Sequence, residues 1–265
     1  MRLIKFKRYV YRTKNIHTDY KLNEAFLDDC IAHFDTKGTP FGNQDRNALK
    51  LFKLDDITLN VKSFRVPNLI NQIAYKFFRK SKAQRSFEYA NKLDGLGIGT
   101  PQPVAYYEYK TLFLFKKSYY ISAQLDCDLT YRALTKDLDY PNHEAILRAF
   151  TRFTYLLHEK NVKFLDHSPG NTLINKSTNG YDFYLVDLNR MEFKTMDLNE
   201  RIKNFAKLTT HKSMIKTMSD EYAKCCGASF ETVFNIMWQE TQDFQNRYWR
   251  RRRIKNKLKF WKKKK

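Results

Sequence analysis

An aspartate and an asparagine five residues apart are the residues of this chain best suited to chemistry. Asp166 and Asn171 lie in a polar loop between two apolar stretches, and a second aspartate, Asp187, ends the strand-like run Tyr184 to Val186. Phosphoryl transfer needs a hydroxyl held in line, a group that takes its proton, and Mg²⁺ to neutralise phosphate charge. Asp166 is suited to accept the proton, while Asn171 and Asp187 offer the hard oxygen ligands that Mg²⁺ prefers.

The stretch between the two aspartates predicts how Asp187 is positioned. Ser177 to Gly180 is a turn sequence between two apolar runs, which predicts a β-hairpin. The Asp-x4-Asn spacing alone is common by chance. A polar loop followed by an aspartate at a strand end would show the same residues without any catalytic role. The interpretation as a phosphotransferase therefore depends on a cationic partner elsewhere in the chain.

Lys62 is the candidate for that cation. Ile57 to Phe64 alternates apolar and polar residues as a strand does, with Lys62 near its end. A strand lysine that contacts the α- and β-phosphates of a nucleotide is usual in kinases. Ser81 to Leu93 predicts a helix, and Glu88 in its middle is the carboxylate expected to pair with Lys62. The alternatives are an exposed strand lysine and a solvated glutamate on a helix face.

The residues around Glu88 also resemble a known family. The run K-S-K-A-Q-R-S-F-E, which ends at Glu88, is the most specific part of a segment over residues 47–93 that resembles the lipopolysaccharide kinase family. The similarity extends over about residues 36–186. The family has a protein kinase-like fold and phosphorylates inner-core sugars, Kdo or heptose. The resemblance implies ATP and Mg²⁺ as cofactors, with catalytic or ligand-binding roles for Lys62, Glu88, Asp166, Asn171 and Asp187.

The chain departs from the protein kinase pattern in informative ways. Phe164-Leu165 stands where protein kinases have His-Arg, so the usual docking point for a phosphorylated activation loop is missing and we expect no such switch. Leu188-Asn189 follows the metal-binding aspartate in place of Phe-Gly, and Asn189 is expected to tolerate a left-handed backbone. Gly38 and Gly42 are the glycines expected to cover the phosphates. An ordinary turn is an equally good interpretation of these two glycines.

The order of predicted elements favours an α+β, bilobal, protein kinase-like fold with a small antiparallel-sheet N-lobe and a mainly helical C-lobe. Strands dominate the first half of the chain and helices the second. Gln124 and Leu125 are expected at the hinge, where backbone groups would bind adenine. We expect a basic segment over 1–21, an N-lobe over about 22–124, a C-lobe over about 125–246 and a basic amphipathic tail over 247–265.

Strands and helices are predicted from hydrophobic periodicity and from turn residues. Strands are expected over 48–54, 57–64, 104–115 and 119–125, the last two joined at Lys116-Lys117. Helices are expected over 22–34, 68–78, 81–93, 144–160, 197–211, 213–225 and 230–250. His167, next to Asp166, is expected either to contact the substrate or to have a structural role.

The net charge of +21 is concentrated at the two ends. Residues 247–265 hold 12 Lys or Arg and no acid, and residues 1–21 hold seven bases and one acid. The remainder has 30 basic and 27 acidic residues, so the body of the chain is nearly neutral. Such ends call for an anionic partner. In the tail, Ile254, Leu258 and Trp261 follow a helical spacing, which favours an anionic membrane surface over a disordered tail or a nucleic-acid-binding one.

The expected cellular compartment is inferred from the absence of an apolar spanning segment and of a cysteine pattern. No apolar run reaches the length of a membrane-spanning helix, and the four cysteines fit neither a zinc site nor a disulfide framework. We therefore expect a cytoplasmic protein, peripheral on the inner face of the inner membrane, with free thiols.

Three functions compete to explain these residues. The first is an ATP-dependent kinase for a Kdo or heptose hydroxyl of a lipopolysaccharide core glycolipid, with no nucleic acid involved. The second keeps the chemistry with a protein Ser/Thr or a small molecule as acceptor. The third is a pseudokinase, or a basic module that binds membrane or nucleic acid. The intact set of Lys62, Asp166, Asn171 and Asp187 argues against the third.

Overall fold

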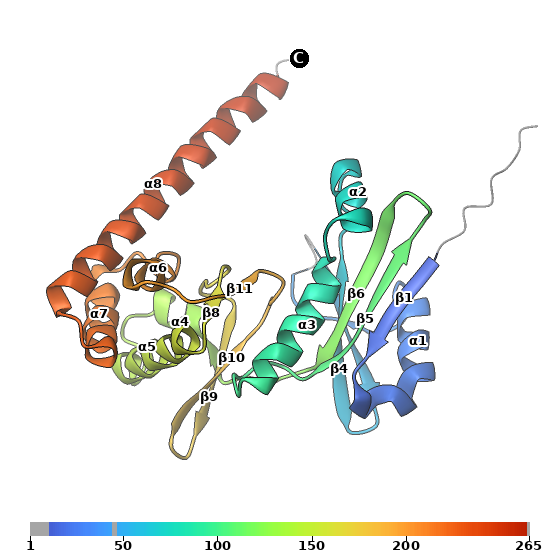
Figure 1. Ribbon diagram of the computed structural model, residues 1–265, viewed down its shortest axis with the longest axis horizontal. Coiled ribbons are helices and arrows are strands. Elements are labelled where there is room, and N and C mark those ends of the chain that lie inside the picture. Colours follow the sequence, from blue (N-terminus) through green and yellow to red (C-terminus); the bar gives the residue numbers. More distant parts are fainter. Residues whose placement is uncertain (1–10, 44–46, 264–265) are drawn as a thin grey trace, which may run out of the picture. The chain divides into compact units, whose positions relative to one another are not determined.

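The computed structural model describes residues 11–43 and 47–263 (Figure 1). The chain divides into two compact units. The first unit contains the described residues up to Asp126 together with Asp187–Asn189, and the second contains Cys127–Val186 and the residues from Arg190 onward. The short segment Asp187–Asn189 thus joins the first unit, although the residues on either side of it belong to the second.

The first unit is built on a six-stranded antiparallel sheet. Its strand order is β1-β5-β6-β4-β3-β2. The strands are β1 (Tyr11–Ile16), β2 (Thr39–Pro40), β3 (Ala48–Leu54), β4 (Ile57–Phe64), β5 (Pro103–Lys110) and β6 (Phe115–Ala123). The predicted hairpin of β3 and β4 is confirmed, with Asp55 in the turn at a positive φ of 51°.

The connection between β5 and β6 differs from the prediction. Residues 111–114 form the turn, in which the Thr111 N–H donates to the Leu114 carbonyl at 2.8 Å. Lys116 and Lys117, expected at the turn, therefore lie inside β6. The apolar pair Leu112-Phe113 occupies the turn instead, although apolar residues usually indicate a strand, and both side chains are exposed.

Helices cover both faces of this sheet (Figure 1). The helical elements are η1 (Thr18–Asn23), α1 (Glu24–Ala32), α2 (Leu69–Phe77) and α3 (Lys82–Gly95). Leu27 and Ile31 of α1 share a core with Leu59 and Val61 of β4. Phe87 of α3 packs in a separate cluster with Phe64 of β4. Because alternate strand residues point to opposite faces, Lys62 lies on the Phe64 side, which α3 covers.

The described part of the N-terminal segment belongs to the first unit. Residues 11–16 form β1 and pair with β5, so they belong to the sheet and not to a separate basic segment. Arg12 and Lys14 of β1 pair with Asp28 of α1, which satisfies their charges within the fold. Residues 1–10 of the expected basic segment lie outside the described residues.

The second unit is mainly helical. Its helices are α4 (Tyr131–Lys136), α5 (His143–Glu159), α6 (Leu198–Lys203), α7 (Lys212–Cys226) and α8 (Phe230–Lys263). Two small sheets accompany them, ordered β10-β9-β7 and β11-β8. Their strands are β7 (Leu129–Thr130), β8 (Val162–Phe164), β9 (Thr172–Ser177), β10 (Gly180–Leu185) and β11 (Met191–Phe193). The predicted hairpin before Asp187 is confirmed as β9 and β10.

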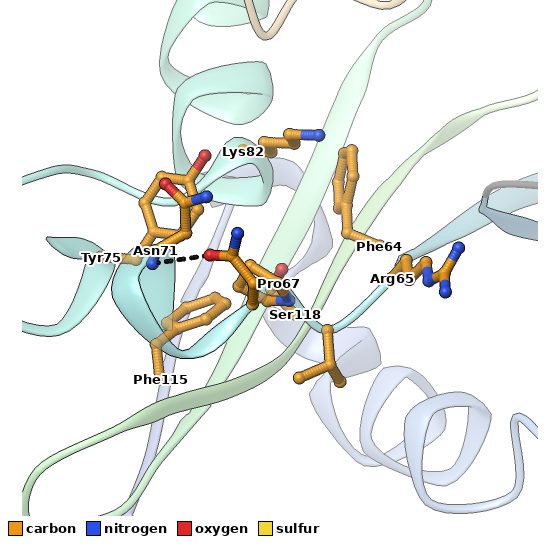
Figure 2. A pocket seen from close by; sticks show the side chains of 10 residues that line it. Phe64, Arg65, Pro67, Asn71, Tyr75, Lys82, Phe115 and Ser118 are labelled. Atoms are coloured by element: carbon orange, nitrogen blue, oxygen red, sulfur yellow. Dashed lines mark hydrogen bonds between the residues drawn. The ribbon is translucent and has the colours of Figure 1, made fainter. Parts of the chain in front are cut away.

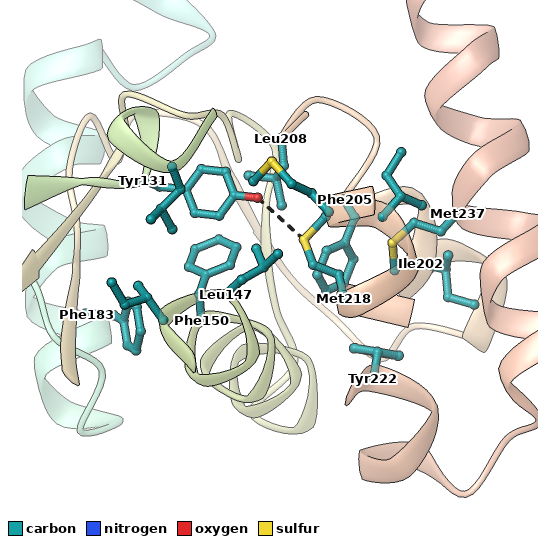
Figure 3. Close-up of a cluster of buried hydrophobic side chains, with 14 of the residues drawn as sticks. Tyr131, Leu147, Phe150, Phe183, Ile202, Phe205, Leu208, Met218, Tyr222 and Met237 are labelled. Carbon is teal, nitrogen blue, oxygen red and sulfur yellow. Dashed lines mark hydrogen bonds between the residues drawn. The ribbon is translucent and has the colours of Figure 1, made fainter. Parts of the chain in front are cut away.

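The core of the second unit forms around α5 (Figure 3). Phe150 of α5 is fully buried, and its ring centroid lies 4.3 Å from that of Tyr131 in α4. The Tyr131 hydroxyl donates to Met218 Sδ of α7 at 3.5 Å, a contact drawn in the figure. These contacts join α4, α5 and α7 beneath the loop that carries Asp166.

Two helix predictions in this unit are wrong in length. The helix expected over residues 197–211 ends at Lys203. Phe205, Leu208 and Thr209 are buried beyond it with the spacing of one helix face. The backbone there forms separate turns with i to i−3 bonds instead, such as the Phe205 N–H to the Ile202 carbonyl at 3.0 Å. The helix expected to end at Arg250 instead continues as α8 to Lys263, so much of the basic tail extends a helix whose buried residues end at Thr241.

Candidate active site

Lys62 and Asp187, 125 residues apart, form an ion pair in the first unit. The Lys62 Nζ lies 2.7 Å from Asp187 Oδ1, and the lysine side chain is only 17% exposed. Asn189 donates to the same carboxylate oxygen from Nδ2 at 2.6 Å and is itself buried. The Lys62 Nζ also lies 5.4 Å from the centroid of the Phe64 ring. A cation and a carboxylate are thus held together at the position where the sequence placed phosphate and metal binding.

The backbone at Asp187 is left-handed. Its φ is 60°, whereas we expected the left-handed residue of this turn to be Asn189. Aspartate tolerates this region better than most residues, at a cost of about 1–2 kcal/mol. The turn buries Leu188 and aims both polar side chains at one place. A strained residue that carries a functional side chain is a common feature of active sites.

Asp166 and Asn171 lie in the loop between β8 and β9 of the second unit. The Asn171 amide nitrogen donates to the Asp166 carbonyl at 2.9 Å, which leaves the amide oxygen directed away from that carbonyl. The Asn171 N–H donates to the Ser168 carbonyl, and the Asn171 carbonyl accepts from the Val186 N–H, both at 3.0 Å. These bonds hold Asn171 in place, with its amide nitrogen directed at the Asp166 carbonyl.

Two cations of the second unit, which the sequence analysis missed, surround Asp166. Arg190 Nη1 lies 3.1 Å from Asp166 Oδ1, and Lys207 Nζ lies 4.0 Å from the same oxygen. Burial lowers the pKa of Lys207, and the nearby Asp166 charge partly opposes that shift. Lys207 follows α6, and no spacing in the sequence links it to Asp166. Arg190 is only three residues from Asp187, which is the one signal that could have found it.

A third cation lies against the same loop. A Cβ atom added at Gly170 would lie 2.4 Å from a terminal nitrogen of Arg132, so the guanidinium of α4 rests directly on the loop backbone. Together Arg132, Arg190 and Lys207 give the loop a positive surrounding. Such a surrounding suits phosphate groups of a donor or an acceptor.

Of the roles expected for His167, the structure supports the structural one. Its side chain is fully buried and stacks on Phe150 at a centroid distance of 5.3 Å. The Nε2 atom lies 3.3 Å from Thr154 Oγ1. Burial lowers the pKa of His167 to about 3, so it is a neutral packing residue beneath the loop.

Glu88 does not pair with Lys62 in this structure. Both of its carboxylate oxygens accept from Lys80 Nζ, at 2.9 and 2.8 Å, and Gln84 Nε2 donates to it at 3.0 Å. Lys80 immediately precedes the N-cap of α3, so its long side chain reaches Glu88 along the same helix. Lys62 has Asp187 as its carboxylate partner instead.

Gly38 and Gly42 both adopt a positive φ, 79° and 64°. A Cβ at Gly38 would lie 2.6 Å from the Phe52 ring, so this glycine is required for packing against β3. Between the two glycines, Thr39 of β2 pairs with Leu51 of β3. This geometry accounts for both glycines as an edge turn, and a role in covering phosphates stays a prediction.

Gln124 is tied into the sheet. Its N–H donates to the Thr58 carbonyl at 2.7 Å, and its side-chain oxygen accepts from Asn60 at 2.8 Å. Its Nε2 donates to the Leu125 carbonyl at 3.3 Å. The adenine contacts expected at Gln124 and Leu125 would therefore have to use other backbone groups of this segment.

A pocket of about 500 Å³ opens beside Phe64 in the first unit (Figure 2). It lies near the end of β4, between the N-terminal ends of α2 and α3, where Asn68 caps α2 by accepting from the Asn71 N–H. The residues that line it are Phe64, Arg65, Val66, Pro67, Asn68, Asn71, Tyr75, Lys82, Phe115 and Ser118. The sequence analysis did not predict this pocket.

Neither a dedicated metal cluster nor a spanning helix occurs in the described part of the chain. No group of three or more His, Cys, Asp or Glu side chains in residues 11–43 and 47–263 is placed to hold a metal ion. Among the same residues, no helix is both long and apolar enough for a membrane crossing.

Comparison with known proteins decides the family. The family model for the lipopolysaccharide kinase (Kdo/WaaP) family matches residues 57–228, a range that includes Lys62, Asp166, Asn171 and Asp187. The chain belongs to the lipopolysaccharide kinase family. This confirms the resemblance found in the sequence and makes the chain a member of a family of kinases.

The fold of this lipopolysaccharide kinase family member also matches a solved structure. The chain is similar to a structure described as WaaP in complex with acyl carrier protein, with a TM-score of 0.62 and 14% sequence identity. The match covers 88% of this chain and 98% of that one. It confirms the α+β, protein kinase-like bilobal fold. No curated protein sequence matches the chain.

Proposed function

We propose that this protein transfers the γ-phosphate of ATP to a hydroxyl of an inner-core sugar, Kdo or heptose, of lipopolysaccharide. The observation that carries the proposal is the Lys62–Asp187 ion pair, with Asn189 donating to the same carboxylate. Lys62 and Asp187 are among the residues to which the resemblance to the family gives functional roles, and they are 125 residues apart in the chain.

Each residue has a role in this proposal. Lys62 would bind the α- and β-phosphates. Asp187, oriented by Asn189, and Asn171, oriented by its bond to the Asp166 carbonyl, would hold Mg²⁺. When bound, Mg²⁺ would neutralise the charge on the phosphates. The donor set fits this ion because it consists of a carboxylate and an amide oxygen.

Asp166 would take the proton of the sugar hydroxyl. The hydroxyl oxygen forms a bond to the γ-phosphorus, the bond from that phosphorus to the β–γ bridging oxygen breaks, and ADP leaves. Arg190, which pairs with Asp166 in the structure, would hold the carboxylate in position. Lys207 and Arg132 would add positive charge for the phosphates of a donor or of an anionic sugar acceptor.

The acceptor would be presented by a membrane. A core glycolipid is anchored in a bilayer, so the proposal places the protein peripherally on the inner face of the inner membrane, where ATP is available. The basic C-terminal residues support this placement by their charge. Glu88, Gly38, Gly42, Gln124 and Leu125 stay as proposed nucleotide contacts without a contact in the structure that assigns them.

The test is phosphate transfer from γ-labelled ATP to purified core lipopolysaccharide. Asp166→Asn should lower kcat by about 10²–10⁴-fold, because a general base is lost, while nucleotide affinity changes little. Asp182→Asn is the matched control, since Asp182 is an exposed aspartate of β10 in the same unit.

Mass spectrometry of the glycolipid should show a gain of one phosphate. Transfer that persists undiminished in Asp166→Asn would contradict the role of Asp166. Labelling of a generic protein acceptor in preference to the glycolipid would favour a protein kinase. Absence of any ATP- and Mg²⁺-dependent thermal stabilisation would favour a pseudokinase.

A further inference from the structure

Helix α2 turns its apolar face outward. Leu69, Ile70, Ile73 and Phe77 fall on one side of the helix and are 60%, 79%, 42% and 55% exposed. No residue of α2 is buried. This is the reverse of the usual arrangement, in which the apolar stripe of a surface helix faces the core.

The opposite face of α2 attaches the helix to the sheet with few contacts. Gln72 Oε1 accepts from Lys116 Nζ of β6 at 3.2 Å, and the Tyr75 ring lies 5.6 Å from that of Phe115. Asn71 and Tyr75 line the 500 Å³ pocket beneath the helix (Figure 2). The inner face of α2 therefore borders an open pocket, and its hydrophobic side is left for another partner.

A second exposed apolar element lies next to α2. Leu112 and Phe113, in the turn between β5 and β6, are 60% and 66% exposed. The turn leads directly into Phe115 and Lys116, the two residues that hold α2. Figure 1 shows α2 and this turn at the same end of the sheet. Phe78, which follows α2, is 81% exposed and extends the apolar surface.

The two chain segments that form this surface contain basic residues and no acidic ones. No Asp or Glu occurs from residue 65 to residue 86, or from 109 to 117. The bases of these two segments are Arg65, Lys76, Arg79, Lys80, Lys82, Arg85, Lys110, Lys116 and Lys117. Arg79 lies over the Tyr75 ring at 5.9 Å, and Lys76 over the Phe77 ring at the same distance. Apolar side chains bordered by cations match a layer of acyl chains beneath phosphate headgroups.

We propose that α2 and the β5–β6 turn form a membrane-docking surface that inserts its apolar side chains into an anionic phospholipid bilayer. A contiguous apolar surface of this kind on a soluble unit marks an interaction site. A second copy of the chain fits it poorly, because a symmetric contact would bring the same basic border against itself. This surface belongs to the first unit and is separate from the basic tail.

This proposal rests on the proposed function. It adds the surface by which the enzyme would reach its lipid-anchored acceptor. Its test measures binding to vesicles without ATP or lipopolysaccharide. A failure of the kinase assay would leave this result unaffected, and the reverse also holds.

The experiment measures cosedimentation of the full chain with vesicles of phosphatidylethanolamine and phosphatidylglycerol. The double variant Ile70→Ser/Phe78→Ser should weaken binding by on the order of tenfold or more, because two inserted side chains are lost. Leu22→Ser is the matched control, since Leu22 is fully exposed on η1 of the same unit. Thermal unfolding should be unchanged in both proteins, because the replaced side chains are exposed.

Two further experiments test the contribution of the basic residues and the depth of insertion into the bilayer. Arg79→Gln/Lys82→Gln should weaken binding to these vesicles and leave the weak binding to phosphatidylcholine vesicles unchanged. In the variant Phe78→Trp, brominated lipids should quench the added tryptophan, whereas Leu22→Trp should show no quenching beyond that of the native tryptophans.

Three results would overturn the proposal. The first is unchanged vesicle binding by Ile70→Ser/Phe78→Ser in a protein that also lacks residues 247–265. The second is equal quenching in the two tryptophan variants. The third is a dimer in solution that Ile70→Ser/Phe78→Ser dissociates, which would assign the surface to a second copy of the chain.

Discussion

Four consecutive residues carry much of the chemistry at the residue scale. Asp187 accepts from Lys62 and from Asn189 in the first unit, whereas Arg190 donates to Asp166 in the second. The left-handed φ of Asp187 turns the chain sharply enough to bury Leu188. The strained backbone at Asp187 thus brings contacts with two carboxylates, those of Asp187 and Asp166, into one short segment. The contacts that Asn189 and Lys62 make with Asp187 offset the cost of this strain.

Two buried histidines should make the protein sensitive to acid. Burial lowers the pKa of His158 to about 4 and of His167 to about 3. In the unfolded chain both take up a proton near pH 6.5, so stability is full above that pH and falls as the pH drops toward the folded values. Each histidine should cost about 2 kcal/mol of unfolding free energy between pH 7 and pH 5.

Urea denaturation at pH 7 and at pH 5 measures this loss of unfolding free energy. His158→Gln should lower stability at pH 7, because its bond to the Tyr222 hydroxyl is lost, but the further loss at pH 5 should be about half that of the unmodified protein. The idea fails if a protein lacking both histidines loses as much stability between pH 7 and pH 5 as the parent.

At the element scale, β1 and α1 are joined through Asp28. Its carboxylate accepts from Arg12 and Lys14 of β1 and from the buried Tyr107 hydroxyl of β5, at 2.8, 2.8 and 2.9 Å. Burial raises the pKa of Asp28, but the hydrogen bonds from Lys14, Tyr107 and Arg12 outweigh it, so the net effect is a lowered pKa. One carboxylate therefore holds an edge strand, a helix and a central strand together.

Removal of Asp28 should destabilise the first unit. Asp28→Ala leaves the Tyr107 hydroxyl and the Lys14 ammonium without their shared partner, and we expect a loss of about 2–3 kcal/mol in unfolding free energy. Asp29→Ala is the neighbouring control. Asp29 pairs with Lys37 on the surface, so its removal should cost no more than about 1 kcal/mol. Denaturant titration of both variants measures the difference, and equal losses would show that Asp28 does not join these elements.

At the scale of the whole molecule, the chain combines a nearly neutral body with basic ends. The long helix α8 continues into this C-terminal charge, with Arg250 to Arg253 as exposed, consecutive bases. Within residues 230–257, for which side-chain exposure is described, the last buried residue of α8 is Thr241. Residues 246–257 are all exposed, so their side chains are accessible to a partner.

Deletion of residues 247–265 tests that partner. Thermal stability should stay within about 0.5 kcal/mol of the full chain, because residues 247–257, the part of this segment whose exposure is described, are all exposed. Binding to phosphatidylglycerol vesicles should weaken and lose most of its salt dependence, because 12 bases are lost. Vesicle binding that is unchanged, together with a loss of binding to single- or double-stranded nucleic acid, would assign the tail to nucleic acid instead.

Local patterns determined most of the elements and the family. The alternation of Ile57 to Phe64 predicted β4, and the turn sequence at Ser177 predicted the β9–β10 hairpin. The helices α2 and α3 were also predicted from local sequence, because each element depends on neighbours along the chain. The motif around Glu88 gave the family for the same reason.

Only the tertiary structure decided which charges meet. It paired Lys62 with Asp187 and Glu88 with Lys80. It also placed Arg190 and Lys207 beside Asp166, and Arg132 against Gly170 of the same loop. It also placed the apolar side of α2 outward, a choice that the helical pattern alone leaves open. Sequence periodicity states which residues share a face, but the direction of that face and the partners of a charge depend on contacts between distant segments.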